Sequence, residues 1–357
     1  MITGYGSVER IRERAAERRE IDTERVLHVL RRHHPWTFRT IPDPHSLVRE
    51  FARFPVTVNF HPDRVAADGH TAAESLQVTG VFRTQFETGT SAGSYSPEPT
   101  GARAQWERTL FGLESVDPVH RPRYGGLNMA GHPDGAAPRF GSCVLELNPR
   151  TLTRSTLAVG DSHTLPEDIG TIDESMPVLA GLLERADATG GVFRLPSGSV
   201  GGLVDLLRAP RASARITEPG RALDDYLEVQ VHGPVHLDSD VVGMVLDPSF
   251  RGTAIGDRLT DAAATHGVRV RWHRGFRTTP EDIDPQFRGP GTVEMARRVQ
   301  GTFGVITPET IGRAHRRWAT VGEPTSGTDL DSPGAADPGQ QLKYLWHALV
   351  EFGGPFR

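Results

Sequence analysis

Residues 56–64 have the sequence VTVNFHPDR, and this stretch decides the fold class. Valine, threonine and phenylalanine favour extended chain, so a strand is expected over residues 56–60. Pro62 cannot donate to a strand ladder and restricts the residue before it, so the strand should end near His61. His61, Asp63 and Arg64 are therefore expected at the rim of a sheet, where their side chains face solvent or a cleft.

Outward from this strand, expected strands and helices follow one another along the chain. Runs rich in β-branched residues predict strands at residues 81–86, 142–147, 226–231, 241–246 and 268–272. Periodicity and capping residues predict helices at residues 7–19, 22–34, 45–53, 72–77, 102–111, 174–188, 200–208, 253–265, 292–302, 308–319 and 341–351. Short strands with helices packed around them indicate an α+β fold.

The length of 357 residues fits two domains, or one enlarged domain with an appendage. We expect a helical N-terminal extension over residues 1–47, a core over 48–275 and a C-terminal helical region over 276–357. Within the last region, residues 321–340 have the composition of a linker.

Composition narrows the classes of function. A net charge of −5 disfavours a nucleic-acid partner. Residues 1–20 lack the apolar segment of a secretory signal, and no uncharged run approaches the roughly 18 residues that cross a bilayer. The expectation is a soluble protein without a membrane partner, in the bacterial cytoplasm or exported by a non-classical route into a target cell.

The basic residues are strongly biased, because 39 of the 40 are arginine and Lys343 is the only lysine. The bias has two readings, a GC-rich coding genome or avoidance of lysine modification in a foreign cytosol. In either case, a lysine nucleophile would have to be Lys343. Cys143, the only cysteine, excludes an intramolecular disulfide.

Two polar clusters follow the strands near the N-terminal side of the core. In the first, Arg64 could bind a phosphate and His61 a ribose or an amide; the alternative is a turn with a structural Asp–Arg pair. The second covers residues 83–94, where glycines and hydroxyl residues could offer backbone N–H groups to a phosphate. It matches neither a Walker A loop nor a GxGxxG motif, and a flexible surface loop is the alternative.

A third cluster lies on the strand expected at residues 226–231. Glu228, Gln230 and His232 are two residues apart and share one face of this strand, while the other face is apolar. Such a row suits a cleft wall, although a half-exposed edge strand has the same pattern. A carboxylate there could stabilise a developing cation or act as a base. No metal site is expected, because no sequence motif has metal-ligand spacing.

These clusters belong to an ordered series of blocks that also includes residues 105–112, 123–128, 135–142 and 245–250. Over roughly residues 50–275, the series resembles a bacterial family of domains of unknown function that is similar to the CteC-like ADP-ribosyltransferases, which modify threonine on ubiquitin. The resemblance implies an ADP-ribosyltransferase-like catalytic core of two small packed sheets with flanking helices. It also implies that NAD binds in a cleft between these sheets.

The resemblance further implies site residues. The catalytic set would be Glu228, His61 and Gln230. The NAD-binding set would be Asn59, Phe60, His61, Arg64, Arg83, Gln85, Phe86, Thr88, Gly89, Thr90, Ser91, Tyr124 and Asn128. The resemblance implies an Arg or His on a first strand, a second element with a Ser-Thr-Ser-like sequence or a Tyr, and a Glu on a later strand. Whether His61 or Arg64 fills the first-strand role stays open. Residues 88–91 would supply the second element, with residues 140–142 as a competitor.

The implied function is that of an NAD-dependent mono-ADP-ribosyltransferase, an enzyme of the glycosyltransferase class. NAD would be the ADP-ribose donor, and a protein, with threonine of ubiquitin as the candidate, would be the acceptor. The protein would then act as a bacterial effector or toxin. Two alternatives remain: a metal-independent hydrolase that pairs Glu228 with Asp63 or Glu87, and a non-catalytic protein-binding module.

Overall fold

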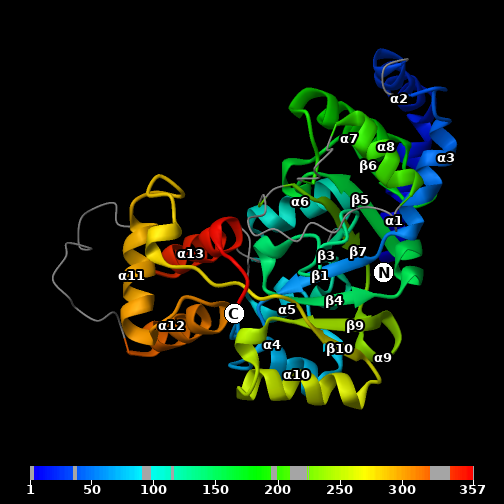
Figure 1. Cartoon of the computed structure of the whole chain (residues 1–357). Coiled ribbons are helices and arrows are strands. Elements are labelled where there is room, and N and C mark those ends of the chain that lie inside the picture. Colours follow the sequence, from blue (N-terminus) through cyan, green and yellow to red (C-terminus); the bar gives the residue numbers. More distant parts are fainter. Residues whose placement is uncertain are drawn as a thin grey trace.

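The computed structural model describes residues 4–34, 38–90, 98–113, 116–193, 199–209, 223, 225–321 and 338–356. Within these ranges, an eight-stranded sheet lies at the centre, and helices flank it (Figure 1). Its strands are β1 (Val56–Phe60), β3 (Arg123–Leu127), β4 (Cys143–Leu147), β5 (Ser155–Val159), β6 (Ile169–Thr171), β7 (Leu227–Val231), β9 (Val241–Leu246) and β10 (Arg269–Trp272). A two-stranded sheet pairs β2 (Val81–Phe82) with β8 (Val235–His236). The expected α+β class is confirmed.

The large sheet has the strand order β10-β9-β4-β1-β3-β7-β5-β6, and every neighbouring pair except β9 and β10 is antiparallel. β1 and β3 pair only at Val56–Leu127 and Thr57–Gly126. Beyond this short seam, β1 stays paired with β4 and β3 stays paired with β7. The resemblance implied two small packed sheets, whereas the structure has one eight-stranded sheet whose two four-stranded halves meet at this short seam.

The helices gather in three places around the sheet. They are α1 (Gly4–Glu17), α2 (Arg19–His33), α3 (Pro44–Arg49), α4 (Ala72–Thr79), α5 (Gln85–Thr88), α6 (Ala102–Phe111), α7 (Met176–Thr189), α8 (Val200–Arg208), α9 (Leu237–Asp240), α10 (Ala254–Thr265), α11 (Gly291–Phe303), α12 (Pro308–Val321) and α13 (Pro338–Phe352). Figure 1 shows α4 and α10 near the β10 end of the strand order, and α7, α8 and the N-terminal helices near the β6 end. Helices α11, α12 and α13 form a separate lobe.

The hydrophobic packing differs between the two helical ends of the chain. Apolar side chains of α2 and α3 belong to the same core as the central sheet and α7, so the N-terminal helices are part of the main body. The helices α11, α12 and α13 enclose a core of their own, which includes Ala296, Leu345 and Trp346. The C-terminal region is thus a helical lobe with its own packing. No helix in the described part of the chain is both long and apolar enough to cross a membrane.

The expected strand over residues 81–86 is wrong beyond Phe82. Thr84 accepts a hydrogen bond from the backbone N–H of Glu87, and the Glu87 carboxylate accepts one from the Thr84 N–H. This reciprocal capping starts the helical turn α5 and ends the strand. In the linker expected at residues 321–340, residues 322–337 lie outside the described part, and α13 begins at Pro338.

Candidate functional site

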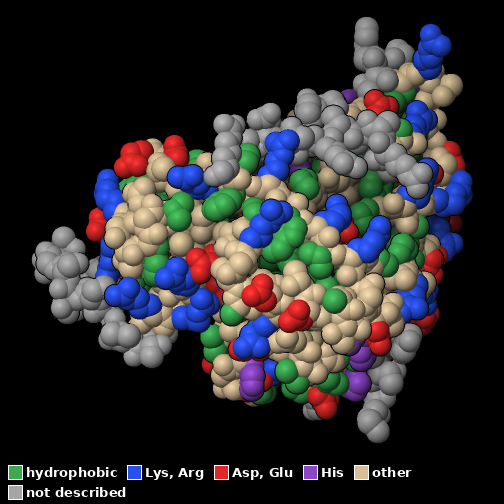
Figure 2. Space-filling view, turned by 60° about the horizontal axis from the view of Figure 1, so that its bottom comes forward, with side chains coloured by type: hydrophobic (Ala, Val, Ile, Leu, Met, Phe, Trp, Pro, Cys, Tyr) green, Lys and Arg blue, Asp and Glu red, His purple; other side chains and the backbone are tan. Residues whose placement is uncertain are grey.

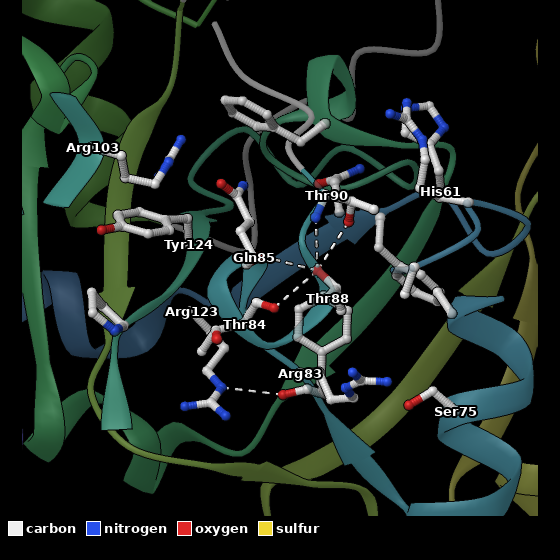
Figure 3. Close-up of a pocket in the computed structure, with 18 of the residues that line it drawn as sticks. His61, Ser75, Arg83, Thr84, Gln85, Thr88, Thr90, Arg103, Arg123 and Tyr124 are labelled. Carbon is white, nitrogen blue, oxygen red and sulfur yellow. Dashed lines mark hydrogen bonds between the residues drawn. The ribbon is translucent and has the colours of Figure 1, made fainter. Parts of the chain in front are cut away.

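A cleft opens where β1 and β3 separate, and ten of the expected site residues line it (Figure 3). They come from β1 and the turn after it, from the segment around α5, from β3 and from β7. The ten are Asn59, Phe60, His61, Arg64, Arg83, Gln85, Thr88, Thr90, Tyr124 and Glu228. The fold therefore brings together three clusters that are far apart in the sequence.

Glu228 is the residue of β7 that reaches the described lining of the cleft, and it is held by a chain of hydrogen bonds. The Gln230 side-chain amide donates to the Glu228 carboxylate. The Gln230 carbonyl oxygen accepts from the Thr156 hydroxyl at 2.6 Å, and Thr156 Oγ1 lies 3.1 Å from His232 Nε2. The polar row predicted from the spacing along β7 is confirmed. Gln230 is fully buried and is not among the residues that line the cleft, so it positions Glu228.

The environment of Glu228 favours its protonated form. Burial and the nearby Asp161 raise the pKa of Glu228 to about 8. Two hydrogen bonds, from the Ser162 backbone N–H at 3.3 Å and from Gln230, act in the opposite direction. A carboxyl group with its pKa near the working pH can act either as an acid or as a base, which is typical of functional sites.

The cleft is rich in positive charge. Among the described residues, it is lined by five arginines and two acidic residues: Arg64, Arg83, Arg103, Arg123, Arg139, Asp161 and Glu228. This ratio contrasts with the net charge of −5 for the whole chain. A cleft lined by one sign of charge concentrates ligands of the opposite sign, so the cleft suits an anion.

Two of these arginines are already bonded within the protein. Arg123 donates to the carbonyl oxygens of Phe82, Val119 and Arg121 and forms a 3.1 Å ion pair with Glu87. Arg83 forms an ion pair with Asp68 at 2.6 Å and donates to the Glu87 carbonyl. Arg83 was expected among the NAD-binding residues, but both guanidinium groups bond Glu87 and so hold the α5 segment in place.

Arg64 and Arg103 differ from that pair. Within the described residues, neither guanidinium group forms a hydrogen bond or a salt bridge, and Arg103 Nε is buried without a partner. Arg103 lies against the rings of Tyr124 and Trp106, with 5.4 Å and 5.5 Å to the ring centroids. Both groups can therefore bind a ligand without breaking a protein hydrogen bond.

Neutral groups complete the lining. Tyr124 donates its hydroxyl proton to Glu107 at 2.7 Å, which fixes the ring beside Arg103 (Figure 3). The side-chain oxygen of Gln85 is buried and accepts no hydrogen bond from the described residues. Burial and Arg64 hold the pKa of His61 well below its usual range, so its imidazole is neutral at neutral pH. The cleft thus offers an unused acceptor and aromatic surface beside its cations.

Several expected site residues have structural roles. Asn59 lines the cleft, but its amide bonds the backbone of Asp134, Ala137 and Gly141 and so holds that loop. Thr88 bonds the Thr84 carbonyl at 3.0 Å and the Thr90 hydroxyl at 2.9 Å. Both candidates for the second element reach the cleft, through Thr88 and Thr90 and through Phe140.

Besides Gln230, three expected residues in the described part of the chain do not line the cleft. Phe86 packs under the Arg121 guanidinium, 3.9 Å from the ring centroid. Gly89 ends α5 with a φ of 67°. Asn128 closes the turn to His132 beyond the end of β3 that is remote from Tyr124. Ser91 lies outside the described residues.

Sequence reasoning missed Arg103, Asp161 and Ser162 as members of the site. Arg103 lies in a helix that was predicted, α6, but a helix pattern does not tell which cavity a side chain enters. Asp161 and Ser162 follow β5, a strand that was not predicted. In the described residues, no three His, Cys, Asp or Glu side chains gather in a way that could hold a metal ion.

The fold and the cleft define an α+β protein with an arginine-rich cleft at the division of its central sheet. The chain belongs to the family described as Protein of unknown function (DUF3626), which it matches over residues 55–352. This range runs from the start of β1 to the end of α13 and includes every cleft residue named above. No curated protein matches the chain.

Proposed function

We propose that the protein is an NAD-dependent mono-ADP-ribosyltransferase and that the cleft is its active site. The observation that carries the proposal is the position of the buried Glu228 carboxyl group among five arginines. A dinucleotide requires cations for its pyrophosphate, and cleavage of its nicotinamide–ribose bond requires a negative charge beside the ribose. The cleft has both kinds of group within one lining.

The arginines without protein partners are assigned to the pyrophosphate. Arg64 and Arg103 lie in the lining and form no hydrogen bond or salt bridge within the described residues. Charge-assisted hydrogen bonds from guanidinium groups to phosphate are among the strongest in proteins, and their geometry is often bidentate. Arg83 and Arg123 would then act indirectly, by holding the α5 segment.

The neutral groups are assigned to the nicotinamide end of the ligand. Gln85 has a buried oxygen that can accept a hydrogen bond from a carboxamide. Tyr124 and Phe60 offer aromatic surface in the same lining. A buried acceptor left without a donor is costly, so a ligand that supplies an N–H group there gains affinity.

Glu228 is assigned to stabilisation of the positive charge that develops on the ribose. Gln230 fixes one carboxylate oxygen by donating to it, and the Ser162 N–H donates to the same oxygen. The other oxygen is left for the substrate. The group must be ionised to act in this way, so its raised pKa makes the activity dependent on pH.

A paired-carboxylate hydrolase remains the second candidate, with one change of partner. Asp63 forms an ion pair with Arg316 and Glu87 pairs with Arg123, and neither lines the cleft. Asp161 does line it, and its charge raises the pKa of Glu228. If the protein is such a hydrolase, the pair is Asp161 with Glu228.

The test is incubation of the full-length protein with NAD, followed by chromatography of free nicotinamide and mass spectrometry of candidate acceptors. Ubiquitin is the first acceptor to test because of the sequence resemblance, and a host-cell lysate is the second. We expect nicotinamide release together with an ADP-ribose adduct on a protein. No nicotinamide release with either acceptor would contradict the proposal, and release without any adduct would favour hydrolysis.

A further inference from the structure

Helix α6 turns a polar face toward the interior of the protein. Arg103, Trp106 and Glu107 lie three and four residues apart, so they share one face of the helix, and all three are buried. Arg103 and Trp106 line the cleft. The helix contacts the 3-10 turn Ser162–Thr164, and Ser162 also lines the cleft. Arg103, Trp106 and Ser162 therefore border one corner of the cleft, the α6 corner.

Each of these three side chains has a buried polar atom without a hydrogen-bond partner among the described residues. The atoms are Arg103 Nε, Trp106 Nε1 and Ser162 Oγ, in side chains of residues that are 7%, 6% and 0% exposed. Ser162 Oγ lies close enough to Glu228 to lower the pKa of that carboxyl group, yet it forms no hydrogen bond with it. Buried polar groups in proteins nearly always have partners, so three such atoms along one lining indicate a ligand that supplies acceptors.

The buried charges beside the α6 corner leave one positive charge without an ion pair. Arg121 forms an ion pair with Oε2 of Glu107, and the Tyr124 hydroxyl donates to Oε1 of the same carboxylate. Both oxygens of Glu107 are therefore occupied. Arg103 lies near enough to lower the pKa of Glu107 but does not bond it. Since one carboxylate balances at most one of the two arginines, a ligand with one negative charge would balance the other.

The two acidic residues of the described lining do not form an ion pair with Arg103. Asp161 Oδ1 lies 2.7 Å from His163 Nδ1. Glu228 accepts hydrogen bonds from Gln230 and from the Ser162 N–H, and its pKa of about 8 keeps most of it protonated at neutral pH. The guanidinium group of Arg103 can therefore bind a ligand without giving up a bond to either carboxyl group.

Two aromatic rings fix the guanidinium group of Arg103. Its Cζ lies 5.5 Å from the ring centroid of Trp106 and 5.4 Å from that of Tyr124, and Figure 3 shows Arg103 beside Tyr124, on the side of the cleft away from His61. The Nε–H of Arg103, the indole N–H and the Ser162 hydroxyl are all donors, and an oxyanion has enough lone pairs to accept from all three. A cationic or an apolar ligand would leave these donors unpaired.

We propose that Arg103, Trp106 and Ser162 form an oxyanion-binding subsite at the α6 corner, beside Glu228, for a group with one negative charge. This group is either one phosphate of the donor's diphosphate or a carboxylate group of another ligand. The first source rests on the function proposed above and adds Trp106 and Ser162 to the role given there to Arg103. The subsite itself does not rest on that function.

The indole N–H group of Trp106 allows a direct test with the full chain. Isotope-labelled tryptophan gives one indole nuclear magnetic resonance signal for each of the five tryptophans, and Trp106→Phe identifies the signal of Trp106. ADP-ribose and acetate are the anionic probes, and adenosine and acetamide are their neutral counterparts. We expect an anionic probe to move the Trp106 proton signal downfield, because the N–H group gains an acceptor. No movement by either anion, or equal movement by its neutral counterpart, would overturn the proposal.

A second tryptophan is the control for general association of anions. Figure 2 shows Lys and Arg side chains spread over the outer face of the molecule, so anions can also bind elsewhere. Trp318 of α12 likewise has a buried Nε1 without a partner, and Arg298 lies over its ring at 5.4 Å from the centroid. Trp318 does not belong to the described lining of the cleft. Its signal should stay in place while that of Trp106 moves, and equal movement of both signals would overturn the proposal.

Variants measure what each side chain contributes. Arg103→Gln should weaken binding of the effective probe about tenfold or more, because a hydrogen bond from a charged group is lost. Ser162→Ala keeps the backbone N–H that bonds Glu228 and should weaken binding about threefold. Arg108→Gln, at an exposed position of the same helix, is the matched control and should keep the wild-type affinity. Equal losses in Arg103→Gln and Arg108→Gln would overturn the proposal.

The concentrations at which the probes act identify the source of the oxyanion. Movement of the Trp106 signal by ADP-ribose at lower concentration than by acetate assigns the subsite to the donor's diphosphate. Movement by acetate at equal or lower concentration assigns it to a carboxylate group. Anion-dependent movement in a protein that releases no nicotinamide from NAD would overturn the proposed function and leave the subsite in place. Nicotinamide release without any movement would overturn the subsite and leave the function.

Discussion

The two walls of the cleft differ in how their polar groups are satisfied. On the β7 wall, Glu228, Gln230, Thr156 and His232 bond one another in a continuous row. On the wall after β1, the Arg64 guanidinium forms no hydrogen bond or salt bridge with any described residue. Groups bonded within the protein are already held in position, whereas groups held without partners are most stable with a ligand. From this comparison we expect the β7 wall to hold the Glu228 carboxylate in position and the wall after β1 to bind an anion.

The largest effect is expected for Glu228 on the β7 wall. Glu228→Gln keeps the shape of the side chain and removes the charge that would stabilise the ribose. Transfer of ADP-ribose should fall by about 10²–10³, or roughly 3–4 kcal/mol. Affinity for NAD should change much less, because positive charge develops only as the bond breaks. Labelled transfer and calorimetry measure the two quantities.

A melting curve of the Glu228→Gln protein is the control for folding. Near wild-type transfer by the folded variant would remove Glu228 from the catalytic role. Loss of transfer and of NAD affinity to the same extent would instead place Glu228 in ground-state binding.

The next effect distinguishes an arginine without a partner among the described residues, Arg64, from one that is bonded within the protein, Arg83. Arg64→Ala should weaken NAD binding by about 1–3 kcal/mol, because it removes charged hydrogen bonds to a phosphate. Arg83→Ala is the matched variant, since Arg83 also lines the cleft but is bonded to Asp68 and to the Glu87 carbonyl. It should lower the melting temperature more than the affinity. If calorimetry finds the wild-type affinity in folded Arg64→Ala, Arg64 is not in the site and His61 is the residue to test next.

The pH dependence follows from the raised pKa of Glu228. A carboxyl group with a pKa of about 8 is protonated at lower pH and must lose its proton to act. The value of kcat/KM should therefore rise about tenfold per pH unit below pH 8 and level off above it. In Asp161→Asn the like charge is gone, so the midpoint should move to lower pH. An unchanged midpoint in that variant would show that Asp161 does not act on Glu228.

The smallest effect, on stability, is expected in the hydrogen-bonded row of Glu228, Gln230, Thr156 and His232. Thr156→Val has nearly the same shape but leaves the Gln230 side-chain oxygen and His232 Nε2 without their partner. The free energy of unfolding should fall by roughly 1–2 kcal/mol, which chemical denaturation can measure. Ser46→Ala, in an exposed part of the chain, is a control whose hydroxyl bonds a neighbouring backbone carbonyl. Equal stability of Thr156→Val and the wild type would show that the row does not depend on this hydroxyl.

The parts of the site that lie along one strand could be predicted from the sequence. A period of two places Glu228, Gln230 and His232 on one face of β7, and the β-branched run before Pro62 gives β1. These patterns are local, so no knowledge of the rest of the chain is needed.

β3 could not be predicted, because its sequence has two adjacent glycines that weaken a strand pattern. The structure gives the reason for them. A Cβ atom on Gly125 would lie 2.4 Å from the Thr57 carbonyl oxygen, and one on Gly126 would lie 2.7 Å from the Ala136 Cβ. The close approach of β1 and the 136 loop requires glycine at both positions, and that approach is a tertiary property.

The choice among arginines was also beyond the sequence. Arg64, Arg83, Arg103 and Arg123 are alike in composition, and only the fold decides which have partners. Arg123 is bonded to three carbonyls, whereas Arg103 meets two aromatic rings. The capping pair Thr84 and Glu87, by contrast, is readable as Thr-x-x-Glu and would have ended the strand at Phe82.

The position of α13 at residues 338–352 has a consequence for biosynthesis. A ribosome completes β1, β3 and β7 well before it reaches the helix that carries Lys343 and Trp346. At about 5–20 residues per second, the interval between β7 and the end of α13 lasts roughly 6–24 s. During that time the nascent chain can assemble the carboxylate wall, while His61 and Arg139 of the cleft lining lack their contacts with Trp346. We expect chains stalled before α13 to be more sensitive to protease around residues 61–64 than chains stalled after it, so that the cleft becomes complete only once α13 has been made.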